Sequence, residues 1–540
     1  MASAGLLRLL HSGLQDDRLL PPKGQPQIKA FQKSFVKTGR FTTEWYRVDF
    51  DNTPVFGQTS KATLPRRGHL ITRAFLMVTL PDIRTSQLAA RKAATDKGQP
   101  FAGPTFGWTN SVGHALVNQA QFTIGGAPID TLDGRLMEVL DEFHTPLEKT
   151  TTVNRMIGRH DNGFSATSNG WDTQNQELAI PLPFWFARGD PSDALPIDAI
   201  GTDLVQMSVT FNSIDNIYTT TRRAISSNNI NTAIPGTNIR YCATAVSNNQ
   251  FTLAPMEESP FYTIDNVNGQ PVYGLNGNPS KSVNASMIPG IQMSANYSFK
   301  DAYLLLEYVY LDKPEANRIR LGDISYPIVQ HYAISPFDTR SMPSARISMR
   351  IPNPTREIYF FAHRTEADLL NAPFLATRDL SGFYVSDLSG IGVIAPWWPD
   401  ASGLNTNVFS PLIPAYSMID SEPIASFSLI YEGKMVRYAT DSPALFRSIL
   451  PSFEQRKSPW HNKYYYHLPF GTHHEHFGLT NHMGHANLDK IQNIELLLNF
   501  QPFRGSVRTT DVPAYTIYVW AETYTILRVY GGRAGLLFGY

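Results

Sequence analysis

Alternation of apolar and polar residues with a period of two is the feature that most constrains the fold of this chain. Three segments carry it clearly, at 205–211, 346–351 and 494–500. Period two places every second side chain on one face of a strand, as in antiparallel sheets that bury one face and expose the other. Aromatic and β-branched stretches interrupted by Pro and Gly continue this pattern elsewhere. The sequence therefore predicts an all-β protein made of many short strands.

Helical patterns are few and short. Asp133 is a good N-cap for a first helix, and Ser442 followed by Pro443 is a good start for a second. The apolar residues of the first helix are Leu136, Met137, Val139, Leu140 and Phe143, and those of the second are Leu445, Phe446, Ile449 and Leu450. We expect both helices to be connections between strands.

The two helices have matching surroundings in the two halves of the chain. Each follows a strand and a glycine turn, at Gly125-Gly126 and at Gly433. Each precedes an x-Leu-Pro-Phe segment, at 181–184 and 467–470, and then a period-two strand. This shared order indicates an internal duplication. A β-sandwich repeated twice is the natural solution, because each copy can close its own core between two sheets.

Length and charge narrow the class of protein. The 540 residues suit two or three domains, and 42% apolar residues give enough material for large cores. Lys plus Arg and Asp plus Glu each number 46, so the basic surplus of a protein that coats nucleic acid is absent. The single cysteine, Cys242, cannot form an intrachain disulfide, which fits synthesis in a reducing cytoplasm.

The N-terminal segment 1–26 is expected to be an arm that precedes the first strand. Leu6, Leu7, Leu10 and Leu14 lie on one face of a short helix. The stretch is too short to span a bilayer, and no run of about 18 apolar residues predicts a transmembrane helix. We expect packing on the same protein or on a neighbour, with docking on a membrane surface as the alternative.

Residues 215–298 are rich in Asn, Ser, Gly and Pro and predict an exposed insertion. A flexible linker is the alternative, against which five aromatic residues argue: Tyr241, Phe251, Phe261, Tyr262 and Tyr273. Two glycosylation sequons begin at Asn284 and Asn296, although such short motifs often arise by chance.

A series of short motifs follows a fixed order along the chain. The most specific motifs are Arg66-Arg67-Gly68-His69-Leu70-Ile71, Ile124-Gly125-Gly126-Ala127-Pro128-Ile129-Asp130 and Pro181-Leu182-Pro183-Phe184-Trp185-Phe186. Further segments of the series are 5–7, 13–16, 27–31, 113–116, 308–312, 484–493 and 531–538. In this order the motifs resemble those of the double-jelly-roll major capsid proteins of nucleocytoplasmic large DNA viruses. One departure is His69, where the family pattern has Asp.

The resemblance implies two tandem eight-stranded antiparallel jelly rolls, at 27–313 and 314–540, with short helices and long loop insertions. It implies a structural protein of the virion and no enzyme. A homotrimer would form a pseudo-hexagonal capsomer of an icosahedral shell. Its implied partners are neighbouring capsomers, minor capsid or penton proteins and an inner membrane, with no direct nucleic acid. Assembly is expected in the host cytoplasm.

The histidines are the strongest candidates for a metal site. Seven of the 14 fall within 461–485: His461, His467, His473, His474, His476, His482 and His485. A His-x-His pair resembles those of cupin-like metal enzymes. The segment has no Cys, and the Glu that such enzymes carry about four residues later is missing. We therefore expect an exposed or inter-subunit polar loop with no essential metal.

Other chemical signatures are absent from the sequence. There is no phosphate-binding glycine loop and no serine nucleophile motif, and Cys242 lies in the polar insertion. We predict no catalytic and no cofactor-binding residues. The pair Trp397-Trp398 could stack on a sugar ring. A receptor- or glycan-binding viral β-sandwich is therefore the alternative function.

Overall fold

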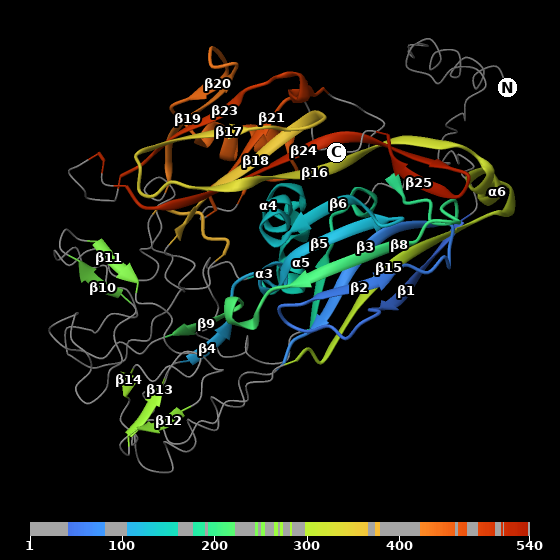
Figure 1. Cartoon of the computed structure of the whole chain (residues 1–540), viewed down its shortest axis with the longest axis horizontal. Coiled ribbons are helices and arrows are strands. Elements are labelled where there is room, and N and C mark those ends of the chain that lie inside the picture. Colours follow the sequence, from blue (N-terminus) through green and yellow to red (C-terminus); the bar gives the residue numbers. More distant parts are fainter. Residues whose placement is uncertain are drawn as a thin grey trace, which may run out of the picture.

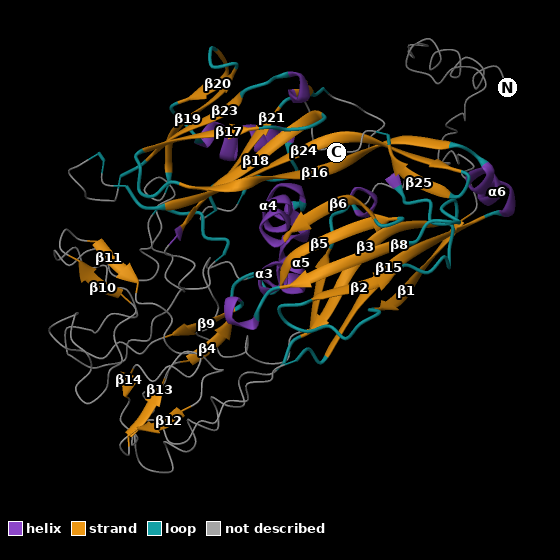
Figure 2. Ribbon diagram, in the orientation of Figure 1, coloured by secondary structure: helices purple, strands orange, loops and turns teal. Residues whose placement is uncertain are grey.

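In the computed structural model, the described residues are 41–81, 105–159, 177–188, 193–221, 298–365, 373–378, 422–459, 463–471, 484–502, 509–510 and 512–537. Five short strands between 243 and 282 are described as well. These parts of the chain are dominated by strands, as Figure 2 shows.

The first half forms a sandwich of two four-stranded antiparallel sheets. Its strands are β1 Phe41–Asp49, β2 Thr59–Thr63, β3 Leu70–Thr79, β5 Val117–Ile124, β6 Ala127–Asp133, β7 Glu177–Pro181, β8 Val205–Phe211 and β15 Asp301–Leu311. One sheet has the order β1-β15-β3-β7 and the other β2-β8-β5-β6. The first and last strands of the sandwich are neighbours, with Phe41 opposite Leu311.

The second half repeats this arrangement. Its strands are β16 Ile324–Asp338, β17 Ser344–Met349, β18 Pro354–Arg364, β19 Ile424–Tyr431, β20 Met435–Thr440, β21 Tyr465–Pro469, β23 Ile494–Phe500 and β24 Tyr515–Tyr530. The orders are β16-β24-β18-β21, extended by β22 Ala486–Asn487 and β25 Arg533–Leu536, and β17-β23-β19-β20. Strand for strand, these orders equal those of the first sandwich. The predicted pair of eight-stranded jelly rolls is therefore confirmed.

The connections repeat too, as the sequence predicted. Gly125-Gly126 joins β5 to β6, and Glu432-Gly433 joins β19 to β20. Helical segments then lead from β6 to β7 and from β20 to β21. Each Leu-Pro-Phe segment lies at the end of the strand that follows. The duplication inferred from sparse identities is thus a duplication of topology.

The helices are short and lie between strands. They are α3 Val112–Leu116, α4 Gly134–His144, η2 Leu147–Lys149, α5 Thr150–Ile157, η4 Trp185–Ala187, η6 Ile214–Asn216, α6 Lys313–Leu321, η9 Leu445–Ile449, α7 Leu450–Glu454 and η10 Leu488–Lys490. Asp133 caps α4 as predicted. The second predicted helix begins at Leu445, three residues after Ser442, and its first turns are a π-helix.

Burial follows the predicted alternation in three strands. β8, β17 and β23 each bury every second residue. β18 departs from it, because all of its residues from Thr355 to Arg364 are buried. A strand buried on both faces has something packed on its outer side, and Figure 1 shows α4 between the two sandwiches.

The insertion contains strands of its own. β9 Tyr218–Thr221 pairs with β4 Thr105–Trp108, β10 Ala243–Val246 pairs with β11 Gln250–Leu253, and β13 Gln270–Tyr273 pairs with β12 Ile264–Val267 and β14 Lys281–Ser282. Figure 1 draws β10 to β14 away from both sandwiches. Asn284, Asn296 and the proposed first-strand segment 27–31 lie outside the described residues. Among the helices that are described, none has the length and apolar character needed to cross a bilayer.

Candidate functional site: the interface between the two sandwiches

Helix α4 is built to lie between the sandwiches. The carboxylate of Asp133 accepts a hydrogen bond from the backbone N–H of Leu136 at 2.7 Å, which satisfies one of the unpaired donors of the first turn. The next residue must be Gly134, because a Cβ there would lie 2.1 Å from the carbonyl oxygen of His114 and 2.4 Å from that of Val117. The apolar residues of α4 belong to the hydrophobic core, and the Phe143 ring also packs against Tyr359 and His467 of the second sandwich, at 5.4 Å and 5.7 Å between ring centroids. Two acidic residues of the helix, Glu138 and Glu142, reach Lys463 of the same sandwich.

Glu138 is the centre of a buried ion cluster that joins the two halves. Its carboxylate pairs with Arg159 at 2.5 Å and with His114 Nδ1 at 2.7 Å, both from the first sandwich. It also accepts from the Lys463 ammonium, which belongs to the second. Burial by itself would raise the pKa of Glu138, but Arg159 and Lys463 hold that pKa well below its usual range. Glu138 is therefore a carboxylate in the folded protein.

Glu142, one helical turn further along, extends the cluster. Lys463 lies 2.9 Å from its carboxylate, Arg159 3.3 Å and Lys457 3.6 Å. Burial opposes the charge, yet these cations lower the pKa of Glu142 to about 2. Two carboxylates on one helix thus share one lysine from the other sandwich. The positions i and i+4 place them on the same helix face.

A second buried cluster lies around His331 of β16. His331 Nδ1 lies 3.1 Å from both carboxylate oxygens of Asp130, and the backbone N–H of His331 donates to the same carboxylate at 3.0 Å. Arg188 approaches His331 Nε2 at 2.7 Å. A guanidinium only donates, so Nε2 must accept and the proton must lie on Nδ1. The geometry therefore fits a neutral His331 that bridges Asp130 and Arg188.

Arg188 also forms an ion pair with Glu522 of β24, and this pair connects the His331 cluster to the sheet of the second sandwich. Burial raises the pKa of Glu522, and the neighbouring carboxylate of Glu357 raises it further, against the effect of Arg188. Glu357 in turn lies 2.6 Å from His467 Nε2 and accepts from Gln455 at 3.0 Å. A chain of buried polar groups therefore runs from β6 across the interface to β21.

Other polar contacts join the halves along the same boundary. They are Trp520 Nε1 to Asp133 at 2.7 Å, His144 with the Tyr359 hydroxyl at 3.0 Å, Gln330 to the Ile129 carbonyl at 2.8 Å, the Thr202 N–H to the Gly532 carbonyl at 2.7 Å, and the Ala534 N–H to Asp203 at 3.0 Å. Buried polar groups satisfy one another only in one relative placement of the two bodies. These contacts therefore hold the two sandwiches together and also fix their relative orientation.

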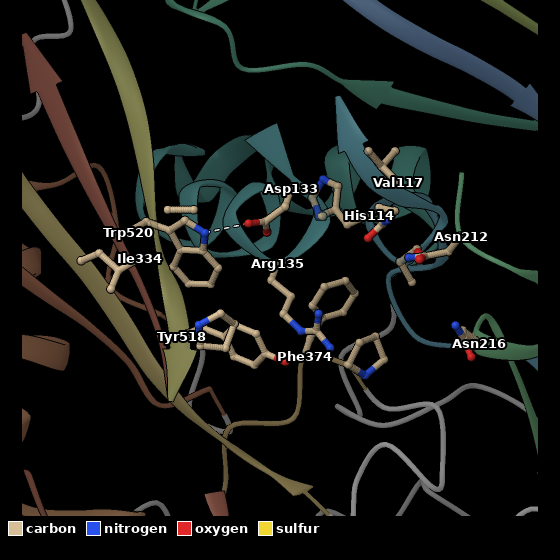
Figure 3. Close-up of a pocket in the computed structure, with 16 residues that line it drawn as sticks. His114, Val117, Asp133, Arg135, Asn212, Asn216, Ile334, Phe374, Tyr518 and Trp520 are labelled. Carbon is tan, nitrogen blue, oxygen red and sulfur yellow. Dashed lines mark hydrogen bonds between the residues drawn. The ribbon is translucent and has the colours of Figure 1, made fainter. Parts of the chain in front are cut away.

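A cavity of about 510 Å³ opens along this boundary. Figure 3 shows Asp133 and Trp520 joined by their hydrogen bond, with Arg135, Tyr518 and Phe374 beside them. The Arg135 guanidinium lies over the Tyr518 ring, 4.4 Å from its centroid. Among the described residues that line it, no serine, cysteine or lysine offers a nucleophile. The cavity is lined by residues of both sandwiches.

Most residues singled out from the sequence lie outside the described part of the chain. These are Asn284, Asn296, Cys242, Trp397, Trp398, His461, His473, His474, His476 and His482. His485 is exposed, but the loop interpretation is wrong for His467, which is fully buried in β21 and bonded to Glu357. Within the described residues, no group of three or more His, Cys, Asp or Glu side chains is placed to hold a metal ion.

The buried charges of the interface were not predicted. The acidic residues looked scattered along the sequence, because their partners come from elements hundreds of residues apart. One local signal existed: Glu138 and Glu142, four residues apart, stand among the apolar residues Leu136, Met137, Val139, Leu140 and Phe143 of the helix. Glu357 and Glu522 likewise stand beside apolar residues of their strands. A charge within a buried pattern indicates a partner from elsewhere.

Comparison with known proteins agrees with this architecture. Residues 29–253 match the family model described as "Major capsid protein N-terminus". "Capsid protein 1" of Acanthamoeba polyphaga mimivirus is 29% identical over 223 residues, covering 40% of this chain and 35% of that protein. The "Major capsid protein" of Pyramimonas orientalis virus is 30% identical over 212 residues, covering 38% and 46%. These alignments span less than half the length of either relative.

The fold comparison extends over nearly the whole chain. The quasi-atomic model of the PBCV-1 virus capsid superposes with a TM-score of 0.60 at 16% identity, covering 94% of this chain and 100% of that one. The Faustovirus major capsid protein gives a TM-score of 0.59 at 12% identity, covering 93% of each. The matched residues 29–253 are less than half of the chain and are similar in sequence to viral major capsid proteins. Nearly the whole chain shares the fold of the PBCV-1 and Faustovirus capsid proteins.

Proposed function

We propose that this chain forms the trimeric, pseudo-hexagonal capsomers of a large icosahedral double-stranded DNA virus shell. The observation that carries the proposal is the identity of strand order in the two sandwiches, which a buried polar interface holds side by side. Two comparable bodies per chain give six bodies per trimer. Six similar bodies around one axis make a tile with nearly sixfold outlines.

A tile must also be stiff. If the two sandwiches rotated freely against each other, the six bodies would not keep a common outline. The clusters around Glu138 and His331 oppose such rotation, since a shift would leave buried charges without their partners. Packing of tiles into a facet then needs heterologous contacts beyond the threefold interface.

The remaining parts of the chain suit peripheral roles in such a shell. We propose that 1–26 is an arm toward neighbouring capsomers, minor capsid or penton proteins, or an inner membrane, and that 215–298 faces outward from a first domain at 27–313. The second domain would comprise 314–540. Equal numbers of acidic and basic residues lessen repulsion between many copies and do not favour nucleic acid. Assembly would take place in the host cytoplasm and the product would be the virion shell.

Size-exclusion chromatography with light scattering tests the trimer directly. The full chain has a mass of 60.4 kDa, so the expected particle has three times that mass. Negative-stain images should show hexagonal outlines. A protein that stays monomeric at every concentration tested would refute the proposal.

A further inference from the structure

The interface between the sandwiches has two sides, a helical connection and a sheet face. Because the fold is duplicated, the chain contains a second copy of each side, and both copies are exposed among the described residues. Inside the chain, the connection between β6 and β7 of the first sandwich, α4, covers the outer face of the sheet β16-β24-β18-β21. The duplication gives each of these partners a counterpart. The counterpart of the covered sheet is β1-β15-β3-β7, and the counterpart of α4 is η9-α7.

The outer face of β1-β15-β3-β7 is apolar where solvent would favour polar residues. Trp45 is 43% exposed, and its ring lies 5.7 Å from that of Phe75. Five further residues of this face are half-buried, and together the seven form the outer patch: Trp45, Phe75, Met77, Ala179, Pro181, Tyr303 and Leu305. Strand pairing places Phe75 between Leu305 and Pro181, and Met77 between Tyr303 and Ala179. The patch is therefore continuous across β15, β3 and β7, and the contact of Trp45 with Phe75 extends it to β1.

Charged residues and a hollow border this patch. Arg47 pairs with Asp301 at 2.9 Å, and Arg73 with Glu307 at 3.6 Å. Phe75 and Pro181 also line a cavity of about 530 Å³ that reaches toward α4 and α5. An apolar centre with a polar border and an adjoining hollow is the usual anatomy of a protein–protein interface.

The segment η9-α7 presents a matching apolar surface. Phe446 is buried against Phe427, 5.1 Å between ring centroids, and anchors the segment on its own sandwich. On the other side, Phe453 is 76% exposed and Ile449 is 50% exposed. Both lie on the connection that corresponds to the α4 connection of the first sandwich. Two large apolar side chains in water on a short helix indicate a missing partner.

We propose that Ile449 and Phe453 of one copy dock on the outer patch of a second copy, repeating between chains the contact that α4 makes within the chain. The occupant is a second copy because the duplication supplies the template: within the chain, the counterpart of this helical connection, α4, already covers the counterpart of this sheet face. The contact is heterologous, so each copy offers one of each surface and a closed ring satisfies all of them. This inference rests on the proposed trimer and names its interface.

The chemistry of the two contacts differs in an informative way. The contact within the chain combines buried ions with the packing of Phe143 on Tyr359 and His467, whereas the proposed contact between chains uses aromatic and aliphatic groups alone. Before the trimer forms, an apolar docking surface exposes no charge that lacks its partner. The apolar version therefore suits the interface that forms last.

The test compares Phe453→Asp with Leu321→Asp in the full-length protein. Leu321 is 83% exposed on α6, so it matches Phe453 in exposure and in apolar character without belonging to either surface. Phe453→Asp should raise the dissociation constant of the trimer by about 30-fold or more, as for the loss of a central hot-spot residue, and Leu321→Asp should leave it within about threefold. Equal thermal midpoints of the monomers would show that both variants fold.

Cross-linking supplies a second readout. Trp45→Cys and Phe453→Cys are made in separate chains, each also carrying Cys242→Ser, and a bis-maleimide is added to the mixture. A cross-linked dimer that needs both variants supports the contact. Trimers that persist in Phe453→Asp, or a dimer band that needs only one variant, would overturn the inference and leave the proposed function standing. A monomeric wild-type protein would overturn both.

Discussion

The sheets β1-β15-β3-β7 and β16-β24-β18-β21 have the same strand order but opposite surroundings. In the first, β3 alternates between buried residues and residues open to solvent, with Arg73 exposed. In the second, β18 is buried from Thr355 onward, including Glu357, His363 and Arg364. Topology is the same in both sheets, so the difference comes from what covers the outer face.

The ion pairs of the two faces differ in the same way. Arg47 and Asp301 on the first sheet are 47% and 43% exposed, whereas Arg188 and Glu522 at the second are 6% and 0% exposed. Water screens the exposed pair and makes it nearly neutral for stability. The buried pair is costly to break, because its partner would remain charged without compensation. A duplicated fold can thus use one sheet face as a fixed joint and leave its counterpart available.

Loss of the Lys463 ammonium should have the largest effect on stability. Lys463→Met removes the cation that Glu138 and Glu142 share across the interface. We expect the free energy of unfolding to fall by about 3–5 kcal/mol, as for other buried pairs that lose one member. Urea unfolding followed by tryptophan fluorescence measures it.

The matched control is Arg47→Met on the exposed sheet, where the loss should be at most about 1 kcal/mol. Equal losses in the two variants would mean that the interface ions are screened like surface ions.

Acid should weaken the buried joint through Glu142. The pKa of this carboxyl is lowered from 4.5 to about 2 in the folded protein, chiefly against its burial by Lys463 and Arg159. A depressed pKa stabilises the folded state above the unfolded value, and that stability is lost as the pH falls from about 4.5 toward 2. At about 1.4 kcal/mol per pKa unit, the contribution is about 3 kcal/mol.

Urea unfolding of the wild type and of Glu142→Gln between pH 6 and pH 2.5 isolates this effect. The difference between the two should shrink as the pH falls. Asp301→Asn, at the solvent-exposed ion pair with Arg47, serves as the control and should follow the wild-type pH dependence. A constant difference between wild type and Glu142→Gln would contradict the assignment.

The two tryptophans of the counterpart sheets give the smallest predicted effect. Trp520→Phe deletes the hydrogen bond from Nε1 to the Asp133 carboxylate, so we expect a loss of about 1.5 kcal/mol. Trp45→Phe changes a side chain that is 43% exposed and should stay within about 0.5 kcal/mol in the monomer. Thermal midpoints measured by calorimetry would compare them. A larger loss for Trp45→Phe than for Trp520→Phe would reverse the assignment of the two faces.

Sequence periodicity predicted the strands that bury only one face. It could not predict that both faces of β18 are buried. β8, β17 and β23 alternate because solvent lies on one side of them. The cap at Asp133 was predictable because both partners of that hydrogen bond lie within four residues. The repeated order of turn, helix and Leu-Pro-Phe predicted the duplication for the same reason, since each signal is local.

The interface could not be predicted in this way. Glu138 meets Lys463, and Asp130 meets His331, only after two separate sandwiches have folded and docked. His467 shows the cost: among many histidines it looked like part of a polar loop, yet it lies in a buried strand beside Glu357. The partner that satisfies a buried polar side chain, such as Glu357 for His467, lies far away in the sequence, so no local pattern contains it.

The pairing of the first strand of each sandwich with its last sets the order of events during synthesis. β1 pairs along its whole length with β15, from Phe41 opposite Leu311 to Asp49 opposite Tyr303. β16 waits in the same way for β24, with Ile324 opposite Val529. On the ribosome, β1 therefore remains an open edge until the whole insertion has emerged, and such edges invite aggregation. A cell that makes this protein in bulk needs chaperones that hold nascent strands apart until their distant partners arrive.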